Sequence, residues 1–399
     1  MTDPPEALPR IPRDSQDQDR AEAILARRAI LKARCGVAFP HVEGETVAAE
    51  ETVGKVENFV GFAQVPIGIA GPLGVDGGEG PFEVYVPLAT TEGAMVASYS
   101  RGMRIAASGG GIRARVVQEG LSQHPVLVFA SAAEACAAAS VCEAALGDCQ
   151  AITAGMTSHG ALTSIATQVI GRRLLLRFVF TTGDAIGINM AARATDLCLR
   201  ELAQRTNALE KHVHGQDVEK RANARALVEG RGRSVIAECV VPRAELQRLA
   251  RTTPEALVAI QRTYATGFAQ MGTQNWLLQA ANGIAGIFLA CGQDLAYVTE
   301  SSTGFLDLEQ TADGDLHVAV TLPSLLIGTV GGGSGQGTAR ECLAMMGCAG
   351  SGKVRRFAEI VAATVLAGDL SLMAAFTADE FSEAHERLGR NRPAPGAGA

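Results

Sequence analysis

Between residues 112 and 211 the chain alternates strand-like and helix-like segments, and long helical patterns resume at 242–293 and 339–388. The runs HPVLVFA and RRLLLRFVFTTG are typical of strands, whereas SAAEACAAASVCEAAL and NMAARATDLCLRELAQRT are typical of helices. About 100 residues of this alternation are enough for a small domain of ferredoxin-like type. The pattern therefore predicts an α+β fold in which this small domain is inserted into a larger, mainly helical one.

The rest of the chain divides around the insertion. Both ends are polar or rich in proline and glycine, which predicts disordered tails. The stretch FLDLEQTADGDLHVAVTLPS predicts a hairpin between the later helices. The expected units are an N-terminal tail at 1–20, the large domain at 21–111 and 224–378, the small domain at 112–211, a connecting loop at 212–223, and a C-terminal segment at 379–399.

The composition narrows the class of protein. Of the 399 residues, 47% are hydrophobic and 19% are charged, which allows a sizeable core. The formal net charge of -7 argues against a nucleic-acid-binding surface, which needs clustered lysine and arginine. The longest apolar stretch contains Glu359 and Asp369 and has helical spacing, which predicts a buried helix rather than a membrane span. No signal peptide is visible, so we expect a soluble cytoplasmic protein with no membrane contact.

The nine cysteines carry little functional signal. They are scattered without CxxC pairs, so their spacing matches neither a zinc site nor a disulfide framework. We expect no metal centre, and we expect most of the cysteines to be small core residues in a reducing compartment.

Two glycine-containing turns are candidate ligand sites. The stretch IGTVGGGSGQGTARE at 327–341 leaves its backbone open to a phosphate, a flat ring or only a neighbouring strand. It lacks the Gly-Lys-Ser/Thr of a P-loop, and it is no GxGxxG after an early strand, which argues against a Rossmann fold. A tight turn and a ligand site both remain open. The second turn, TTGDAIGIN, offers Asp184 as a helix cap or a hydroxyl acceptor.

Four polar residues stand out from apolar surroundings, and each has a purely structural explanation. Glu92 can cap a helix, and Lys220 can belong to a solvated charge run. Asp294 can cap a helix or pair with a basic residue, and His385 can contact a helix C-terminus. Together, however, Glu, Lys, Asp and His form a full set for general acid–base catalysis and oxyanion stabilisation.

Eight motifs in order give the chain a specific resemblance over roughly residues 50–392. They are ENFVGFAQVPIGIAGPL, TTEG, GDAIGINM, EGRGRSV, CGQD, ESS, GTVGGGS and IVAATVLAGDLSL. The chain resembles the 3-hydroxy-3-methylglutaryl-CoA reductase family, particularly its class I members without a membrane anchor. The resemblance implies a nucleotide-binding small domain, dimers with active sites at the subunit interface, and an acyl-CoA substrate. It also implies two NAD(P)H-dependent reductions that convert a thioester into an alcohol through a hemithioacetal and an aldehyde.

The resemblance also assigns catalytic roles. Glu92 is the acid that protonates the carbonyl oxygen, and Lys220, in the connecting loop, faces the developing oxyanion. Asp294 couples to both. His385, on a C-terminal flap, protonates the departing CoA thiolate. These roles make physical sense, because a fixed cation lowers the barrier to forming an oxyanion and histidine titrates near neutral pH.

The implied cofactor site joins the two glycine turns. Its residues are Asp184, Ile186, Gly187, Asn189, Gly331, Gly332 and Gly333. The choice of NADPH or NADH stays open, because the stretch TAGMTSHGALTS carries no cation for a 2′-phosphate and Arg172 and Arg173 lie further on. The family favours NADPH.

The implied substrate-binding residues depart from the family pattern. They are Gln123, Glu219, Arg221, Arg262 and Asn282, of which all but Asn282 replace a different family residue. An arginine in place of a lysine keeps the charge but changes its geometry. The leading hypothesis is reduction of 3-hydroxy-3-methylglutaryl-CoA to mevalonate. A relative that reduces another acyl-CoA or carrier-bound thioester is the alternative. Retention of the four acid–base residues argues against a silent nucleotide-binding protein.

Overall fold

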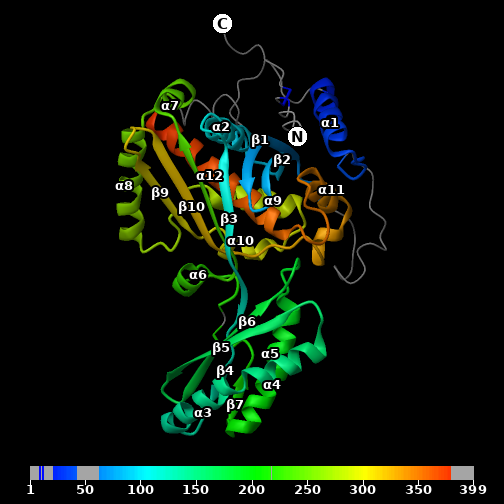
Figure 1. Cartoon of the computed structure of the whole chain (residues 1–399), viewed down its shortest axis with the longest axis vertical. Helices are drawn as coiled ribbons and strands as arrows, with labels where there is room; N and C mark the ends of the chain where they lie inside the picture. The colour runs from blue at the N-terminus through cyan, green and yellow to red at the C-terminus, as the bar shows by residue number, and fades with distance from the viewer. Residues whose placement is uncertain (1–8, 10, 13–20, 43–62, 217, 379–399) are drawn as a thin grey trace.

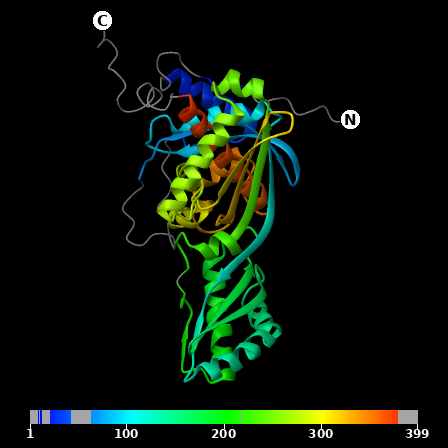
Figure 2. The same cartoon turned by 90° about the vertical axis from the view of Figure 1, so that its left-hand side faces the viewer.

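The computed structural model describes residues 9, 11–12, 21–42, 63–216 and 218–378. They form two lobes, a larger one that contains most of the helices and a smaller one suspended below it (Figure 1). The view turned by 90° shows the two lobes end to end with a narrow waist between them (Figure 2). The C-terminal segment expected at 379–399 and most of the tail expected at 1–20 lie outside the described residues.

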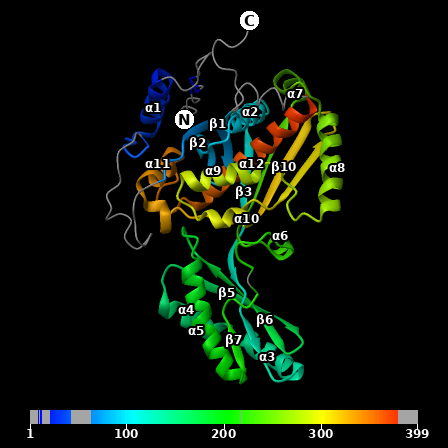
Figure 3. The ribbon, with the colours of Figure 1, turned by 180° about the vertical axis from the view of Figure 1, so that it is seen from behind.

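The smaller lobe is an antiparallel sheet with helices on one face. β5 pairs with β6, and β6 pairs in turn with β4 and with the end of β3. The three helices pack against β3, β5 and β6, as the view from behind also shows (Figure 3). Its elements are β4 (Val126–Val128), α3 (Ala132–Ala144), α4 (Leu146–Met156), β5 (Ala161–Ile170), β6 (Arg173–Thr181), α5 (Ile188–Thr206) and β7 (Glu210–His212).

The larger lobe is built on a second sheet in which β2, β1, β3, β8, β10 and β9 lie in that order. Its strands are β1 (Ile67–Gly77), β2 (Gly80–Ala89), β3 (Ile112–Gln123), β8 (Gly232–Val241), β9 (Phe305–Gln310) and β10 (Leu316–Leu325). β9 and β10 pair antiparallel, which confirms the hairpin predicted at 305–324. The larger lobe was expected to be mainly helical, and the extent of its sheet was not predicted, because β8 follows no clean alternation.

The helices of the larger lobe include the long helix α12, which packs against the sheet and against α2, α7, α8 and α9. They are α1 (Ala21–Cys35), α2 (Met95–Ala107), α6 (Ala224–Glu229), α7 (Arg243–Ala250), α8 (Pro254–Met271), α9 (Ala280–Ala290), α10 (Val298–Ser301), α11 (Gly337–Met345) and α12 (Val354–Thr377), with 3-10 turns η2 (Leu295–Tyr297) and η3 (Gly332–Gly335). α12 is apolar and long enough to cross a membrane, but 83% of its apolar window is buried among the sheet, α2, α8 and α9. This confirms the predicted buried helix. α2 approaches α12 closely because Gly102 faces the backbone of Ala367 with no side chain between them.

β3 belongs to both lobes. Its residues 113–120 pair with β8 in the larger sheet, and Leu121–Gln123 pair with β6 in the smaller sheet. The boundary expected at residue 112 therefore falls at the start of a shared strand, because a continuous strand carries no sequence break at the waist. Residues 213–216 and 218–231 return the chain to the larger lobe, so the two lobes are joined at two crossings of the chain (Figure 1).

The described cysteines agree with the sequence analysis. All nine are free, and seven of them are buried, in both lobes. Burial raises the pKa of the Cys142 and Cys239 thiols to about 12, as expected for inert core residues.

Candidate active site

Lys220 and Asp294 form an ion pair at the waist. Lys220 lies in the returning chain, and its Nζ is 3.7 Å from Oδ2 of Asp294. The two side chains are about half exposed, at 48% and 47%. Asp294 directly precedes η2, and its Oδ1 also accepts the N–H of Ala296 at 3.0 Å. Asp294 is thus both the helix cap and the partner of Lys220, two roles that the sequence left as alternatives.

Glu92 and Asn282 form a second pair. Glu92 follows β2 and is exposed, and its Oε2 accepts a hydrogen bond from Nδ2 of Asn282 at 3.1 Å. Asn282 lies in the first turn of α9, whereas Asp294 follows the last turn of that helix. α9 has 11 residues and is therefore about 16 Å long. Among the described residues, no hydrogen bond or ion pair joins the Glu92 pair to the Lys220 pair.

One short segment contacts Lys220 at three points. Besides the ion pair with Asp294, Nζ of Lys220 lies 5.2 Å from the ring centroid of Tyr297. The backbone N–H of Lys220 donates to Oε1 of Glu300. Residues 294, 297 and 300 share one face, because η2 and α10 are continuous and residues three apart meet on a helical turn. This face supports both the side chain and the backbone of Lys220.

A buried ionic network lies beneath this loop. The guanidinium of Arg231 donates to both carboxylate oxygens of Glu300, at 3.0 and 2.9 Å, and to Glu219 at 2.9 Å. Glu219 also accepts from Gln123 at 3.1 Å and from the Tyr297 hydroxyl at 3.2 Å. Burial raises the pKa of Glu300, and Arg231 opposes that shift. Burial, followed by the charge of Glu219, raises the pKa of Tyr297.

The two glycine turns lie against each other. The backbone carbonyl of Asp184 accepts the N–H of Thr329 at 2.8 Å, and the Gly328 Cα approaches the backbone of residues 184–186 too closely to carry a side chain. The Asp184 carboxylate accepts the N–H groups of Gly352, Lys353 and Val354 at 2.8, 3.1 and 3.2 Å. Asp184 therefore caps α12 and joins the smaller lobe to the larger one.

Arg233 ties the same turns together from the interior. Its guanidinium donates to the carbonyl of Ile327 at 2.9 Å and to the carbonyl of Gly183. Its Nε donates to Glu119 at 3.1 Å, which satisfies the buried charge. The start of β8 thus serves both regions. Arg231, just before the strand, contacts the Lys220 loop, and Arg233, within the strand, contacts the glycine turns.

The triple glycine has two parts. Gly331 and Gly332 have φ angles of 79° and 56°, and a Cβ at either position would meet open space. Gly333 instead faces the backbone of Gly292 at a distance that excludes a side chain. Gly187 begins α5 with a φ of 81°, Ile186 is partly buried beside it, and Asn189 is exposed in the first turn. The open surface beside the joined turns is therefore lined by glycine and a helix N-terminus, which suits a phosphate or a ribose.

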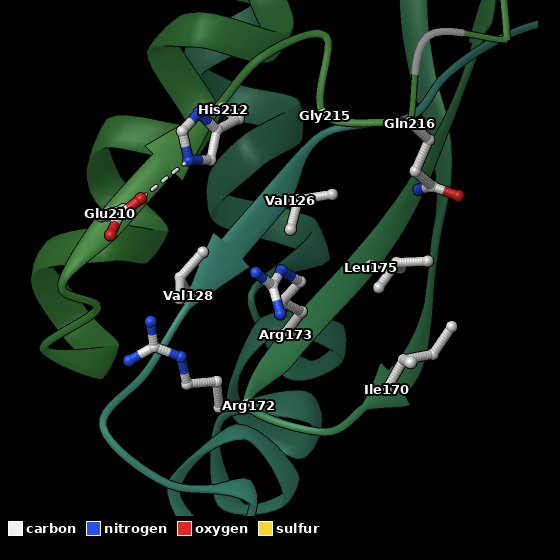
Figure 4. A pocket seen from close by; sticks show the side chains of 10 residues that line it. All are labelled: Val126, Val128, Ile170, Arg172, Arg173, Leu175, Glu210, His212, Gly215 and Gln216. Carbon is white, nitrogen blue, oxygen red and sulfur yellow. Dashed lines mark hydrogen bonds and ion pairs between the residues drawn. The ribbon is translucent and has the colours of Figure 1, made fainter.

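Arg172 and Arg173 lie away from these turns. They are at the start of β6, whereas Gly183 follows its end, about 26 Å further along the strand. Both line an open hollow of about 290 Å³ on the helix-free face of the smaller sheet, with Glu210 and His212 on the opposite rim (Figure 4). The hydrogen bond between His212 and Glu210 measures 3.1 Å. These arginines are too remote to contact a 2′-phosphate bound at the joined turns.

The predicted substrate-binding residues are dispersed. Gln123 is 2% exposed and bonded to Glu219, so both belong to the buried network. Arg221 is exposed next to Lys220, and Asn282 holds Glu92. Arg262 is exposed on α8, at the outer edge of the larger lobe (Figure 1). His385 lies outside the described residues.

Several residues of the site were missed by the sequence analysis. They are Arg231, Arg233, Gln293, Tyr297 and Glu300. Gln293 accepts the N–H of Gly328 at 2.8 Å and so supports the glycine loop. The motifs EGRGRSV, CGQD and ESS contain all of these except Tyr297, but there they served only to mark the resemblance. The sequence did hold one signal for the arginines. Arg231 and Arg233 adjoin the buried residues of β8, and a buried charge needs a buried partner.

The chain is similar to known proteins along most of its length. The family model for hydroxymethylglutaryl-coenzyme A reductase matches residues 23–390. A 3-hydroxy-3-methylglutaryl-coenzyme A reductase of Pyrococcus abyssi is 38% identical over 93% of this chain and 94% of its own length. That of Methanothermobacter thermautotrophicus is 39% identical over 92% of this chain and 94% of its own. The class II reductase of Streptococcus pneumoniae, solved with NADPH in open conformations, superposes with a TM-score of 0.72 at 19% identity, over 88% of this chain and 96% of that one.

Proposed function

Because the chain belongs to the hydroxymethylglutaryl-coenzyme A reductase family, we propose that it reduces 3-hydroxy-3-methylglutaryl-CoA to mevalonate and free coenzyme A, with NADPH as the reductant. The observation that carries this proposal is the Lys220–Asp294 pair, held at the same waist as the two joined glycine turns. Relatives named 3-hydroxy-3-methylglutaryl-coenzyme A reductase match this chain along nearly their whole length. The enzyme is an oxidoreductase.

The joined turns fit the cofactor. Gly331 and Gly332 leave backbone open to solvent, and the N-terminus of α5 beside them carries partial positive charge. These glycines, with Asp184, Ile186, Gly187 and Asn189, hold the dinucleotide, and Gly333 and Asp184 fix the loops. NADPH bound there supplies one hydride for each of the two reductions. The antiparallel sheet and one-sided helices of the smaller lobe support an inserted ferredoxin-like, non-Rossmann nucleotide-binding domain.

The chain's own residues supply the charges and protons. Each reduction places negative charge on a carbonyl oxygen, which the Lys220 ammonium stabilises while Asp294 holds Nζ in place. Glu92, oriented by Asn282, delivers the proton to that oxygen. His385 protonates the departing CoA thiolate between the two reductions. Two hydrides and the matching protons convert the thioester into the alcohol and the free thiol.

A homodimer completes the active site. The Glu92 pair lies at the first turn of α9 and the Lys220 pair lies beyond its last turn. Among the described residues no bond joins the two pairs, which supports an active site completed by a second subunit. The half-exposed Lys220 and Asp294 leave room for a second subunit to bring its own Glu92 pair to them. Arg221, next to Lys220, provides a cation for the acyl carboxylate. The enzyme acts in the cytoplasm, where its free cysteines stay reduced.

The test is oxidation of NADPH by the purified protein with 3-hydroxy-3-methylglutaryl-CoA, followed by the loss of NADPH absorbance. Mevalonate and free thiol should form, with two NADPH consumed per thiol released. Lys220→Ala should abolish turnover while the protein remains folded. Turnover of other acyl-CoA or carrier-bound thioesters, but not of this substrate, would instead favour a relative with a changed acyl pocket. NADH in place of NADPH measures cofactor preference in the same assay.

A further inference from the structure

We propose that the buried Arg231–Glu300 pair is a positioning device for Lys220, and that turnover depends on the negative charge of Glu300 although Glu300 never touches the substrate. The proposal rests on the proposed function, because it assumes that Lys220 acts in the reaction. Neither the family resemblance nor the acid–base set assigns a role to Glu300.

The backbone of Lys220 needs external support. Its φ angle is 59°, in the left-handed region that residues with a side chain rarely adopt. A residue stays there when its surroundings fix it, and such residues gather at functional sites. The backbone N–H of Lys220 donates to Oε1 of Glu300. Glu300 lies in α10, 80 residues further along the chain, so the support comes from outside the loop.

Glu300 is itself fixed by charge. Its side chain is fully buried, and both of its oxygens accept hydrogen bonds from Arg231, whose side chain is 2% exposed. Arg231 also donates to the carbonyl of Ser122 at 3.1 Å, which anchors it to β3. A buried carboxylate remains ionised when a buried guanidinium compensates it, so the pair is rigid and excludes water.

The same guanidinium anchors two consecutive residues of the loop. Arg231 binds Glu219 directly and binds Lys220 through Glu300. The peptide between residues 219 and 220 is thereby held at both ends. This fixes the direction in which the Lys220 side chain leaves the backbone, towards Asp294 and across the Tyr297 ring. A displacement of about 1 Å at such a group can cost 10²-fold in rate.

The network is separate from the glycine turns. Those are held by Arg233, Gln293 and Asp184, and among the described residues none of the three bonds to Arg231 or Glu300. Loss of the Glu300 charge should therefore act on the rate of turnover and leave NADPH binding nearly unchanged. This division separates a positioning role from a general loss of stability, which would affect both.

The decisive variant is Glu300→Gln. The glutamine amide has the same shape, but it carries no charge. Its oxygen can replace only Oε1, which accepts from both Lys220 and Arg231, so its NH₂ group replaces Oε2 and meets the Arg231 donor at 2.9 Å as a second donor. The matched control is Glu359→Gln. Glu359 is 4% exposed, burial raises its pKa as it does for Glu300, and it accepts the backbone N–H of Gly78 at 3.0 Å, on the β1–β2 turn.

We expect Glu300→Gln to lower kcat about 10²-fold with the KM for NADPH within about twofold of the parent. Hydrogen exchange measured without any ligand should become faster in residues 218–222 and stay unchanged in 328–333. Glu359→Gln should leave kcat and both exchange rates unchanged. Glu300→Asp keeps the charge on a shorter side chain, so its kcat should lie between those of Glu300→Gln and the parent. It replaces Glu300→Gln in these measurements if the glutamine variant does not fold.

Three results would overturn the proposal. The first is a kcat for Glu300→Gln equal to that of Glu359→Gln. The second is a fall in kcat that accompanies faster exchange throughout the protein and a raised KM for NADPH, which indicates a structural role only. The third is full activity of Lys220→Ala, which removes the proposed function of Lys220 as well. In the first two cases a dead Lys220→Ala enzyme would leave the proposed function standing.

Discussion

Asp184 and Val354 are joined across the waist, because the carboxylate of the first accepts the backbone N–H of the second at 3.2 Å. This bond belongs to a cap that also takes the N–H groups of Gly352 and Lys353, so a turn of the smaller lobe closes the N-terminus of the core helix α12. The turn that caps the N-terminus of α12 therefore also borders the proposed cofactor site.

Asp184→Ala should lower the stability of the protein and weaken the binding of NADPH. Loss of a helix cap typically costs about 1 kcal/mol of the free energy of unfolding, and released turns should raise the KM for NADPH. Urea unfolding followed by circular dichroism measures the first effect, and steady-state kinetics measures the second. Asp313→Ala, in the exposed turn between β9 and β10, is the control and should change neither. A stable Asp184→Ala protein with unchanged KM would contradict the cap.

Arg233 should control cofactor affinity rather than turnover. Arg233→Met removes the donors to the carbonyls of Gly183 and Ile327 and lets the two turns separate. We expect a Kd for NADPH raised about tenfold, because one or two hydrogen bonds to a charged group are lost. Isothermal titration gives the Kd directly. Arg113→Met, which removes an exposed arginine from β3, should leave it unchanged, and an unaltered Kd for Arg233→Met would refute the role.

Two inactive variants should complement each other if the active site is shared between subunits. In mixed dimers of Glu92→Gln and Lys220→Ala chains, one of the two sites would receive an intact Glu92 and an intact Lys220. We expect each pure variant to be inactive and the mixed, refolded or co-expressed sample to regain part of the parent activity. Sedimentation checks that dimers form. No recovery from verified mixed dimers would place both groups in one chain.

Asp369 should make the stability pH-dependent. Its side chain is fully buried on α12, and burial raises its pKa from 3.8 to about 6, against two backbone hydrogen bonds that lower it. The folded protein thus holds this proton more tightly than the unfolded chain. The stabilisation is complete below about pH 4 and is lost as the pH rises through about 6.

The measurement compares the parent with Asp369→Asn across that range. The difference in the free energy of unfolding between the two should fall by about 3 kcal/mol from pH 3 to pH 7, because 1.4 kcal/mol corresponds to one pKa unit. Glu300 and Glu359, whose pKa values burial also raises, are present in both proteins and cancel. A difference that is flat with pH would show that Asp369 has the same pKa folded and unfolded.

The sequence was informative where pattern and chemistry coincide locally. The alternation at 112–211 predicted β4, α3, β6 and α5 of the smaller lobe but not α4 or β5, and the apolar run at 357–376 predicted α12. The resemblance implied that Asp294 couples to both Lys220 and Glu92. The structure pairs Asp294 with Lys220, whereas the described contacts of Glu92 include Asn282 and not Asp294. Whether these residues perform the predicted chemistry remains a prediction, as does every role of His385.

The long-range parts of the site were not predictable. Arg231 and Glu300 are 69 residues apart, and nothing in the spacing indicates that they pair. Gln123 and Glu219 were assigned to the substrate as separate positions, yet the fold brings them into one buried hydrogen bond. Burial decides between a solvated charge and a structural one, and burial is a property of the tertiary structure. The sharing of β3 between the two lobes was not predicted for the same reason. The sequence of one strand does not indicate that it pairs with two sheets.

The arrangement of β3 and β8 also bears on how this architecture could have arisen. The two strands are antiparallel neighbours, and Gly120 pairs directly with Gly232, so the ends of the intervening chain lie about 5 Å apart. In the larger sheet, residues 121–231 occupy the place of a hairpin turn. An ancestral protein with an ordinary two-residue turn there could have acquired the smaller lobe in one insertion, without shifting the register of any strand.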